Sequence, residues 1–392
     1  MKSFLKRHGL SVIGVTVFAV ALAFTLISTN IDRRMNEVRA QQLHVASAEA
    51  DALHKTLIVA DLHADSLLFG RDLVHESRDG HVDFPRMRRG NVALEAFTVV
   101  TKSPKGQNIQ SNAADASDRV TLLAMLNRWP LRSWSSLKER ALYQAERLHH
   151  FEKQDDNFRI VKTVDDLDRL LQDREENPDL IGGFLGIEGL HCLEGDFDNV
   201  GVMIDAGFRM MSATHFFDNE LGGSAHGESH EGLSEFGRKV IEHLQDNSIL
   251  VDLAHVSPAM IDDILEIATA PVVVSHTGVK GTCDSPRNLS DEHLKGIAKN
   301  GGVIAIGMWE EAVCGTDIHA SVDAMRYVTN LVGIDHVAIG SDYDGSITAP
   351  FDITGFPLIT EALMEDGFTE EEIGKIMGGN IVRVLRETLP KK

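Results

Sequence analysis

Residues 56–65 read Thr-Leu-Ile-Val-Ala-Asp-Leu-His-Ala-Asp, an apolar stretch that ends in His63 and Asp65. Side chains two positions apart on a strand point to the same face of a sheet, so both can reach one bound ion. Five further apolar runs end in His, Asp or Glu. The residues at these ends are Glu188, His215, His255, His276 and Asp342. Six strand ends of one kind predict a single shared polar site.

Short apolar runs alternate with amphipathic helical stretches from about residue 56 onward, which is the pattern of βα units in a parallel sheet. Strands are expected near residues 57–63, 91–100, 181–188, 208–215, 248–255, 270–276, 301–308 and 336–342. Eight parallel strands favour an α/β fold, a closed (β/α)8 barrel of the TIM type. The active site of such a barrel lies at the carboxyl ends of the strands, where the polar residues fall.

Helix start signals support this interpretation. Helices are predicted near 234–247 with Ser234 as N-cap, near 258–268 with Pro258 in the first turn, and near 290–299 with Ser290 as N-cap. Two more are expected near 321–331 and 369–388. A long, charged, helical insertion from about residue 111 to 177 separates the second and third strands.

The first 30 residues form a separate unit. Lys2, Lys6 and Arg7 precede an uncharged run from Gly9 to Asn30, which is long enough for a membrane span of about 20 residues. A cleaved signal peptide is the alternative, although its apolar region usually has only about 7–15 residues. We expect an N-terminal transmembrane helix in residues 1–30, a stalk or linker in 31–52 and a barrel domain in 53–392. Under either interpretation the domain is exported, either anchored to the membrane or secreted after cleavage, into the periplasm or the extracellular space.

Composition excludes one large class of function. The chain has 392 residues, 43% hydrophobic and 25% charged, with a formal net charge of −21. This charge repels nucleic acid, and no basic stripe offers phosphate contacts. Motifs for serine hydrolases and for phosphate-binding loops are also missing from the sequence. The sequence leaves open whether the domain forms a homodimer.

The residue types at the strand ends predict metal chemistry. Imidazoles and carboxylates together suit zinc or a similar divalent ion, and one Glu can bridge two ions with its two oxygens. Two neighbouring ions lower the pKa of a shared water toward neutrality, which supplies a nucleophile at pH 7. These residues therefore indicate metal-assisted hydrolysis.

Over roughly residues 50–390 the chain resembles the renal or membrane dipeptidase family, peptidase family M19, a branch of the amidohydrolase-type barrels. The resemblance rests on the order and spacing of His63-Ala-Asp65, Ile187-Glu188-Gly189, Thr214-His215, Val251-Asp-Leu-Ala-His255, Ser275-His276, Arg287-Asn288 and Gly340-Ser-Asp342-Tyr-Asp344-Gly345. It implies a zinc metallopeptidase that hydrolyses dipeptides by attack of a metal-bridged hydroxide on the peptide carbonyl. It also implies two Zn²⁺ per chain, one held by His63, Asp65 and Glu188, the other by Glu188, His255 and His276.

The same resemblance implies roles for three further residues. His215 would polarise the scissile carbonyl, Arg287 would bind the terminal carboxylate of the dipeptide substrate, and Asp342 would move the proton to the leaving amine. A planar guanidinium is suited to gripping a carboxylate with two hydrogen bonds. Arg287 could instead pair with Asp284 or Asp291, nearby in the sequence. Asp344 is expected to order the loop after the last strand.

Two stretches depart from the family pattern, at Leu190-His191-Cys192 and after His215. Phe216 and Phe217 either line an apolar substrate pocket or pack the loop. His191, His226 and His230 are interpreted as loop residues and not as metal ligands. The substrate preference, including stereochemistry at the carboxyl side, is therefore not predicted.

Two other functions compete with the dipeptidase interpretation. Another amidohydrolase-type activity, such as a lactonase, a phosphotriesterase or a deaminase, would use a related barrel. Such sites commonly begin with His-x-His, whereas this chain has His63-Ala-Asp65. A non-catalytic, membrane-tethered binding protein would have lost a ligand or Asp342, and none is missing.

Three cysteines allow one disulfide in an exported domain. Cys283 is expected on the loop after the sixth strand and Cys314 on the loop after the seventh, which are neighbours on the catalytic face. We predict that these two pair and that Cys192 is the free thiol, close enough to Glu188 to bind metal.

Overall fold

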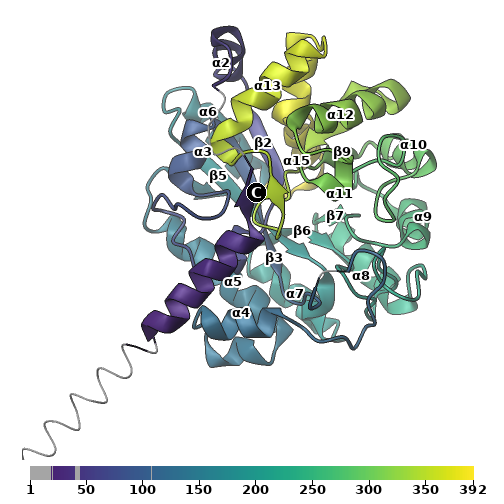
Figure 1. The fold of residues 1–392 in the computed structure, drawn as a ribbon. Coiled ribbons are helices and arrows are strands. Elements are labelled where there is room, and N and C mark those ends of the chain that lie inside the picture. The colour runs from purple at the N-terminus through teal and green to yellow at the C-terminus, as the bar shows by residue number, and fades with distance from the viewer. Residues whose placement is uncertain (1–18, 20, 40–44, 107) are drawn as a thin grey trace, which may run out of the picture.

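A near-closed barrel of eight parallel strands forms the centre of the molecule, with helices around its outside (Figure 1). This computed structural model describes residues 19, 21–39, 45–106 and 108–392. The strands run in the order β10-β9-β8-β7-β6-β5-β3-β2. Their bounds are β2 (Val59–Ala64), β3 (Val92–Val100), β5 (Ile181–Glu188), β6 (Phe208–Ser212), β7 (Leu250–Asp252), β8 (Val273–Thr277), β9 (Val303–Ile306) and β10 (Val337–Ile339). All eight predicted strands are confirmed.

The barrel closes between its two end strands, β2 and β10. Ala64 forms a parallel bridge with Tyr343, just beyond the end of β10. The buried carboxylate of Asp61 on β2 accepts hydrogen bonds from the backbone N of Ser341 at 2.8 Å and from its Oγ at 2.5 Å. The side chain of Asp61 therefore takes the place of some backbone hydrogen bonds between β2 and the segment after β10, two residues before His63.

Helices pack around the outside of the barrel, and some of them belong to the insertion between β3 and β5 (Figure 1). Ser234 caps the helix at 235–246, Ser290 caps the helix at 291–299, and Pro258 opens a third, as predicted. The predicted helix at 369–388 is interrupted by a π-helical turn, Lys375–Gly379. The bounds are α2 (Ala48–His54), α3 (Phe84–Arg89), α4 (Val120–Leu126), α5 (Leu137–Glu152), α6 (Val164–Arg174), α7 (Asp198–Asp205), α8 (Glu235–Asp246), α9 (Pro258–Ile267), α10 (Asp291–Lys299), α11 (Glu310–Val313), α12 (Ile318–Val332), α13 (Phe356–Glu365), α14 (Glu370–Gly374) and α15 (Asn380–Thr388).

The expected insertion between β3 and β5 contains α4, α5, α6 and a short strand, β4 (Phe158–Ile160), which pairs with β5. A capping box at Thr163 starts α6, whose Leu167 and Leu170 are fully buried. These side chains join Met210 of β6 and Leu385 of α15 in one buried apolar cluster. The insertion is thus part of the same folded domain as the barrel.

The N-terminal segment reaches the catalytic end of the barrel. Residues 21–35 are helical, and β1 (Glu37–Val38) pairs in parallel with β11 (Thr348–Ala349). Asp32 is buried, and its Oδ2 lies 2.9 Å from Nε of Arg71. Part of residues 31–52, which were expected to form a stalk or linker, therefore packs against the barrel.

The predicted transmembrane helix in residues 1–30 falls mainly on residues 1–18 and 20, which lie outside the described part of the chain. Among the residues that the structure describes, no helix is both long enough and apolar enough to cross a membrane.

Candidate active site

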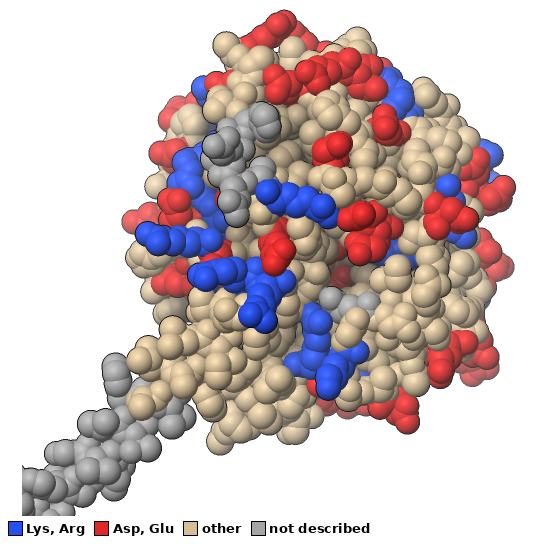
Figure 2. Space-filling model, in the orientation of Figure 1, with Lys and Arg blue, Asp and Glu red and all other residues tan. Residues whose placement is uncertain are grey.

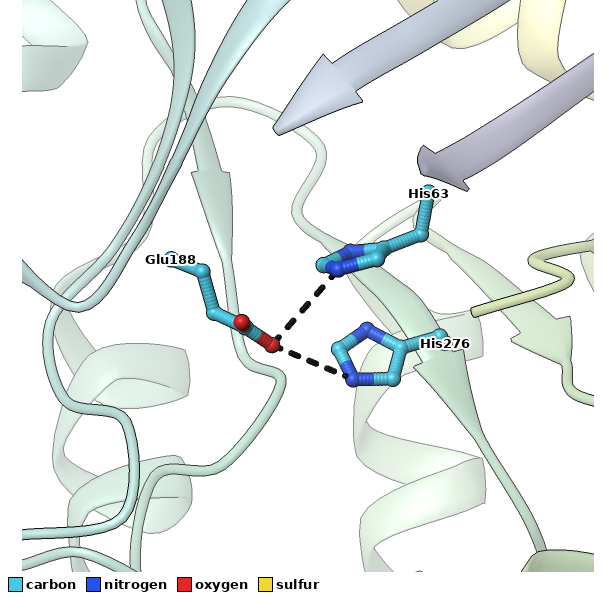
Figure 3. Close-up of side chains that lie close together, drawn as sticks. All are labelled: His63, Glu188 and His276. Atoms are coloured by element: carbon cyan, nitrogen blue, oxygen red, sulfur yellow. Dashed lines mark ion pairs between the residues drawn. The ribbon is translucent and has the colours of Figure 1, made fainter. Parts of the chain in front are cut away.

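The polar residues at the strand ends meet in one buried cluster at the carboxyl end of the barrel. Figure 3 shows His63 from β2 and His276 from β8 pointing toward the carboxylate of Glu188 from β5. Oε1 of Glu188 lies 3.6 Å from Nε2 of His63 and 3.3 Å from Nε2 of His276. Parallel strands bring these residues together although more than two hundred positions separate the two histidines in the chain.

The other predicted site residues join the same cluster. Nε2 of His255 lies 2.8 Å from Oε1 of Glu188, and Nε2 of His215 lies 3.1 Å from Oε2. Nε2 of His63 is 3.6 Å from Oδ1 of Asp65, whose carboxylate also accepts a hydrogen bond from Thr98. Within the described part of the chain, three sets of residues have donor atoms close enough to hold an ion: His63 with Glu188 and His276, Glu188 with His215 and His255, and His63 with Asp65 and Asp342.

These sets only partly match the predicted division of ligands between two ions. Glu188 occurs in two of the three sets, which suits its predicted role as a bridge. His215 and Asp342 also come within ligand distance, although the sequence interpretation assigned them to catalysis. The structure thus brings all seven residues together, while the assignment of each to an ion or to a catalytic step stays a prediction.

Hydrogen bonds fix the orientation of the imidazole rings. Nδ1 of His63 and Nδ1 of His276 lie 3.1 and 3.0 Å from the same atom, Oγ of Ser275. The backbone N of Ser275 donates to Oδ1 of the buried Asp252 at 2.9 Å, which holds Ser275 in place. The two lone pairs of Ser275 Oγ suffice to accept from both rings, and in that arrangement both Nε2 atoms are without a hydrogen and free to bind a cation.

His255 is oriented through a second histidine. Nδ1 of His226 lies 2.8 Å from the carbonyl oxygen of Ile109, which can only accept, so this nitrogen carries the hydrogen. Burial lowers the pKa of His226 to about 4, so the ring is neutral and its Nε2 accepts. Nδ1 of His255 lies 3.1 Å from that Nε2 and is therefore the donor. The lone pair of His255 Nε2 consequently faces the cluster.

These orientations leave acceptor atoms facing one another. Nε2 of His255 lies 2.9 Å from Nε2 of His276, and both face the oxygen of Glu188. Buried Nε2 of His63 has no hydrogen-bond partner among the described residues. Lone pairs that converge in this way repel one another unless a cation lies among them. The donor set of imidazole nitrogens and carboxylate oxygens therefore fits divalent metal ions such as zinc.

Burial sets the protonation tendencies of the cluster. It raises the pKa of Glu188 well above its usual value, and the nearby carboxylate of Asp65 raises it further. Burial also raises the pKa of Asp342, although Arg287 opposes this. The same desolvation lowers the pKa of His215, His255 and His276. A raised carboxyl pKa favours the protonated form, whereas a divalent cation among these groups would favour the carboxylate beside neutral imidazoles, which are the states that bind metal.

His191, which was interpreted as a loop residue, supports His215. Its ring is buried, and Nε2 accepts a hydrogen bond from the backbone N of His215 at 3.3 Å. Nδ1 of His215 lies 3.2 Å from the carbonyl oxygen of Lys102, so Nε2 of His215 faces Glu188. His226 was missed in the same way, whereas His230 is exposed. One feature of the sequence could have indicated these supporting roles: His191 follows the end of β5, and His226 and His230 lie in the loop after β6.

Arg287 lies in the pocket without a carboxylate partner. Its Nη2 donates to the carbonyl oxygen of His276 at 2.9 Å and lies 3.3 Å from Nε2 of His255, and its guanidinium lies 4.9 Å from the ring centre of Trp309. Neither Asp284 nor Asp291, the alternative partners, is within ion-pair distance in the described part of the chain. Nε of Arg287 is buried and has no hydrogen-bond partner among the residues that the structure describes. This arrangement leaves guanidinium donors for a ligand.

The two phenylalanines after His215 have different roles, one in the pocket and one in the packing of the loop. Phe216 lines the catalytic pocket and stacks on His226, with ring centres 4.6 Å apart. Phe217 is fully buried and packs against Lys102 and His191. One aromatic ring therefore shapes the pocket, and the other holds the loop.

Asp344 orders the loop after β10, as predicted. Its carboxylate lies 2.7 Å from Nη2 of Arg71 and accepts hydrogen bonds from Ser66 Oγ and from the backbone N of His81. Burial alone would raise the pKa of Asp344, but Arg71 and then His81 hold it well below its usual value of 3.8. The charged form of Asp344 is thus stabilised by folding.

Asp344→Asn should lower the free energy of unfolding at pH 7 by about 3–5 kcal/mol, because it removes one partner of a buried ion pair. A group whose pKa is depressed by folding contributes stability above its unfolded pKa and loses it as the pH falls. The difference from wild type should therefore shrink below about pH 4. Urea unfolding at several pH values measures this, with Asp335→Asn as control, since Asp335 forms an exposed pair with Lys375. A difference under about 1 kcal/mol at pH 7 would contradict the assignment.

Cys283 and Cys314 form a disulfide, as predicted, with Cα atoms 5.3 Å apart. Cys192 is free and buried, and burial raises the pKa of its thiol to about 12. It belongs to none of the potential ion-binding sets among the described residues. The prediction that Cys192 is the free cysteine is confirmed, but its thiol is not placed to bind metal.

Comparison with known proteins identifies the family. The model of the membrane dipeptidase family, peptidase family M19, matches residues 47–391. The chain belongs to this family. A dipeptidase from Aspergillus oryzae, aclJ, is 29% identical over 328 residues, which cover 79% of this chain and 71% of the relative. The dipeptidase ataJ from Aspergillus terreus is 26% identical over 392 residues, covering 92% of this chain and 89% of that protein.

Solved structures share the fold. The crystal structure of a family M19 metallopeptidase, dipeptidase AC, covers 85% of this chain and 99% of its own, with a TM-score of 0.70 and 23% identity. A metallopeptidase from Rhodobacter sphaeroides, solved with a phosphinate mimic of the dipeptide L-Ala-D-Ala, covers 85% of this chain and 99% of its own, with a TM-score of 0.68 and 22% identity. As a membrane dipeptidase family member, the chain is a metallo-dipeptidase, which sets aside the lactonase, phosphotriesterase, deaminase and non-catalytic alternatives.

Proposed function

We propose that this chain hydrolyses dipeptides with two zinc ions held at the carboxyl end of the barrel. The observation that carries the proposal is the carboxylate of Glu188, which lies 2.8–3.6 Å from the Nε2 atoms of four histidines. The hydrogen bonds at Nδ1 suit Nε2 of the proposed ligands His63, His255 and His276 to accept and so to bind a cation. A bridging carboxylate among imidazole lone pairs is suited to two neighbouring ions.

The proposed ligands are those implied by the family resemblance. His63, Asp65 and Glu188 would hold one ion, while Glu188, His255 and His276 would hold the other. When bound, such ions supply a hydroxide nucleophile at neutral pH and offset the negative charge that develops on the attacked carbonyl oxygen. The remaining requirements of peptide cleavage fall to side chains of the chain itself.

Three side chains would bind and process the peptide. Nε2 of His215 faces the cluster, and in the imidazolium form, which carries hydrogens on both nitrogens, it would donate to the carbonyl oxygen of the scissile bond as its charge develops. Asp342, buried beside the cluster, would take a proton from the attacking water and return it to the leaving nitrogen. The guanidinium of Arg287 would bind the carboxylate at the end of the substrate.

The size of the pocket suits a short substrate. The cavity over the cluster has a volume of about 270 Å³ and is lined by Glu188, His215, Arg287 and Asp342. This is near the lower end of the range for small-molecule sites, which is about 300 Å³. A dipeptide whose carboxylate binds Arg287 would place its single peptide bond over the cluster, whereas a longer peptide would extend past the guanidinium.

Arg287→Ala should raise KM for free dipeptides by about tenfold or more, because the charge-assisted hydrogen bonds to the substrate carboxylate are lost. C-terminally amidated dipeptides lack that carboxylate and should be much less affected. Steady-state kinetics on matched free and amidated substrates measure both effects. Equal losses on the two substrates would show that Arg287 acts through the structure of the site and not through the carboxylate.

The proposed function is tested by amino-acid release from L-Ala-L-Ala and L-Ala-D-Ala by the zinc-loaded protein. A C-terminally amidated dipeptide serves as the poor substrate. Release from either free dipeptide, at a rate well above that of the amidated one, is the expected result. No release from any substrate by protein that contains two zinc ions per chain would contradict the proposal.

We propose further that residues 1–30 anchor the chain to a membrane and that the barrel is exported. The uncharged run from Gly9 to Asn30 supports the anchor, and the Cys283–Cys314 disulfide supports an oxidising compartment. Fractionation of cells that express the full chain should find it in the membrane fraction, with the disulfide formed. A soluble product that lacks residues 1–30 would show that this segment is a cleaved signal peptide and not an anchor. A reduced Cys283 would contradict export.

A further inference from the structure

Arginines line the catalytic pocket together with acidic residues such as Glu310 and Glu311, in a chain whose net charge is −21. Figure 2 shows Lys and Arg side chains around the hollow near the centre of this face, beside a few acidic ones. Three arginines line the pocket: Arg39, Arg119 and Arg287. Arg39 pairs with Glu310 across the rim at 2.7 Å, and Arg287 is already assigned to the terminal carboxylate. Arg119 is the remaining arginine of this group, and no role has yet been assigned to it.

Arg119 has few partners of its own. Its Nη2 donates to Oγ of Ser346 at 2.7 Å and lies 3.7 Å from Sδ of Met35. No hydrogen bond occupies its Nη1 or Nε among the described residues. Burial lowers the pKa of Arg119, which reflects a partly desolvated cation. Arginine nevertheless keeps its charge in proteins, so this guanidinium offers free donors in the pocket.

The acidic residues near Arg119 do not neutralise it. Asp118, its neighbour in the sequence, is held by Arg140, with Nη1 2.6 Å from Oδ2, and by Thr121. No carboxylate lies within 4.0 Å of the Arg119 guanidinium in the described ranges. The residues outside those ranges include no Asp or Glu. A partly buried cation without a counter-ion, in a pocket that admits a ligand, is suited to an anionic group of that ligand.

Arg119 and Arg287 reach the pocket from different loops. The backbone N of Arg119 donates to the carbonyl oxygen of Ser103, which follows β3, and Arg287 lies on the loop after β8. The guanidinium of Arg119 lies at Ser346, on the loop after β10, which is two strands from β8 in the strand order. Because both arginines and the cluster line one pocket, a dipeptide whose terminal carboxylate binds Arg287 and whose peptide bond lies over the cluster would extend its amino-side residue into the part that Arg119 lines.

We infer that Arg119 forms a second anion subsite, which selects dipeptides with a carboxylate on the side chain of the amino-side residue. This inference rests on the proposed function, because it uses the orientation that Arg287 imposes. Aspartyl and glutamyl dipeptides are the chemical class that fits. Ser346, which already accepts from Nη2, holds the guanidinium in place for such a side chain.

The test compares nearly isosteric substrates that differ in charge. Wild-type protein should cleave L-Glu-L-Ala with a kcat/KM at least about tenfold higher than L-Gln-L-Ala, since a charge-assisted hydrogen bond is lost with the amide. L-Ala-L-Glu and L-Ala-L-Gln should differ less, because their variable side chain lies on the carboxyl side. A wild-type ratio near one for the first pair, or a larger ratio for the second pair, would overturn the inference.

Variants separate charge recognition from a structural role. Arg119→Gln should bring the Glu-Ala to Gln-Ala ratio to about one, whereas Arg119→Lys should keep it clearly above one. Damage to the fold would lower both rates and leave the ratio unchanged, which would also overturn the inference. Arg132→Gln is the matched control, because Arg132 pairs with Glu139 and Glu146 outside the pocket. If neutral and acidic dipeptides all remain uncleaved, the proposed function itself fails, whereas cleavage without a charge preference removes only the Arg119 subsite.

Discussion

Glu188→Ala should abolish metal binding and dipeptide turnover together. The carboxylate of Glu188 lies within 3.6 Å of Nε2 of His63, His255 and His276, so it would contribute to both ion sites. Removing it leaves imidazole lone pairs facing one another across a buried cavity. We expect kcat/KM to fall about 10⁴-fold or more, as for catalytic groups that act as one unit.

Metal content and activity must be measured on the same preparations of wild type and Glu188→Ala. Glu228→Ala is a matched control, because Glu228 is exposed and its side chain lies outside the cluster. We expect the control to keep two ions and full activity. Retained turnover in Glu188→Ala, with one ion or none bound, would remove the bridging role and the two-ion account with it.

Asp342→Asn should keep both ions and lose rate. The amide has the shape of the carboxylate but cannot take a proton from water at neutral pH, so the leaving amine is not protonated efficiently. Loss of a general acid–base group typically costs about 10²–10⁴-fold in rate. Asp342 also has a backbone φ of 60°, in the left-handed region that non-glycine residues rarely adopt. Such strain is often retained at functional positions.

The alternative role for Asp342 is that of a ligand, since it lies within ligand distance of His63 and Asp65. The measurement is therefore kcat together with zinc content after dialysis. A proton-transfer role predicts two zinc ions per chain, a largely unchanged KM and a lower kcat. Loss of one zinc from Asp342→Asn would contradict that role and assign Asp342 to metal binding.

The sequence predicted the barrel and the strand-end cluster because both follow from local patterns. Apolar runs mark the strands, and a parallel barrel places all of their carboxyl ends on one face. His63 and Glu188 could therefore be assigned to one site without knowledge of any distance. The pairing of Cys283 with Cys314 followed from the same reasoning, because loops after neighbouring strands are themselves neighbours.

The supporting residues could not be predicted in this way. Ser275 orients His63 from across the barrel, and His226 orients His255 from a loop whose conformation the sequence did not predict. Arg119 comes from the insertion and reaches the pocket through its contact with Ser346. These contacts depend on loop conformations and on long-range packing, which leave no periodic signal in the sequence. The packing of residues 31–39 against the barrel was missed for the same reason.

Zinc titration of metal-free protein tests the central claim most directly. Turnover of L-Ala-L-Ala, or of whichever dipeptide is cleaved fastest, is followed as zinc is added to a known concentration of chains. Two cooperating ions predict that activity rises to its plateau at two zinc ions per chain and is lost again with a chelator. Full activity in chelator-treated protein with no bound metal, or a plateau at one zinc ion per chain, would contradict the account.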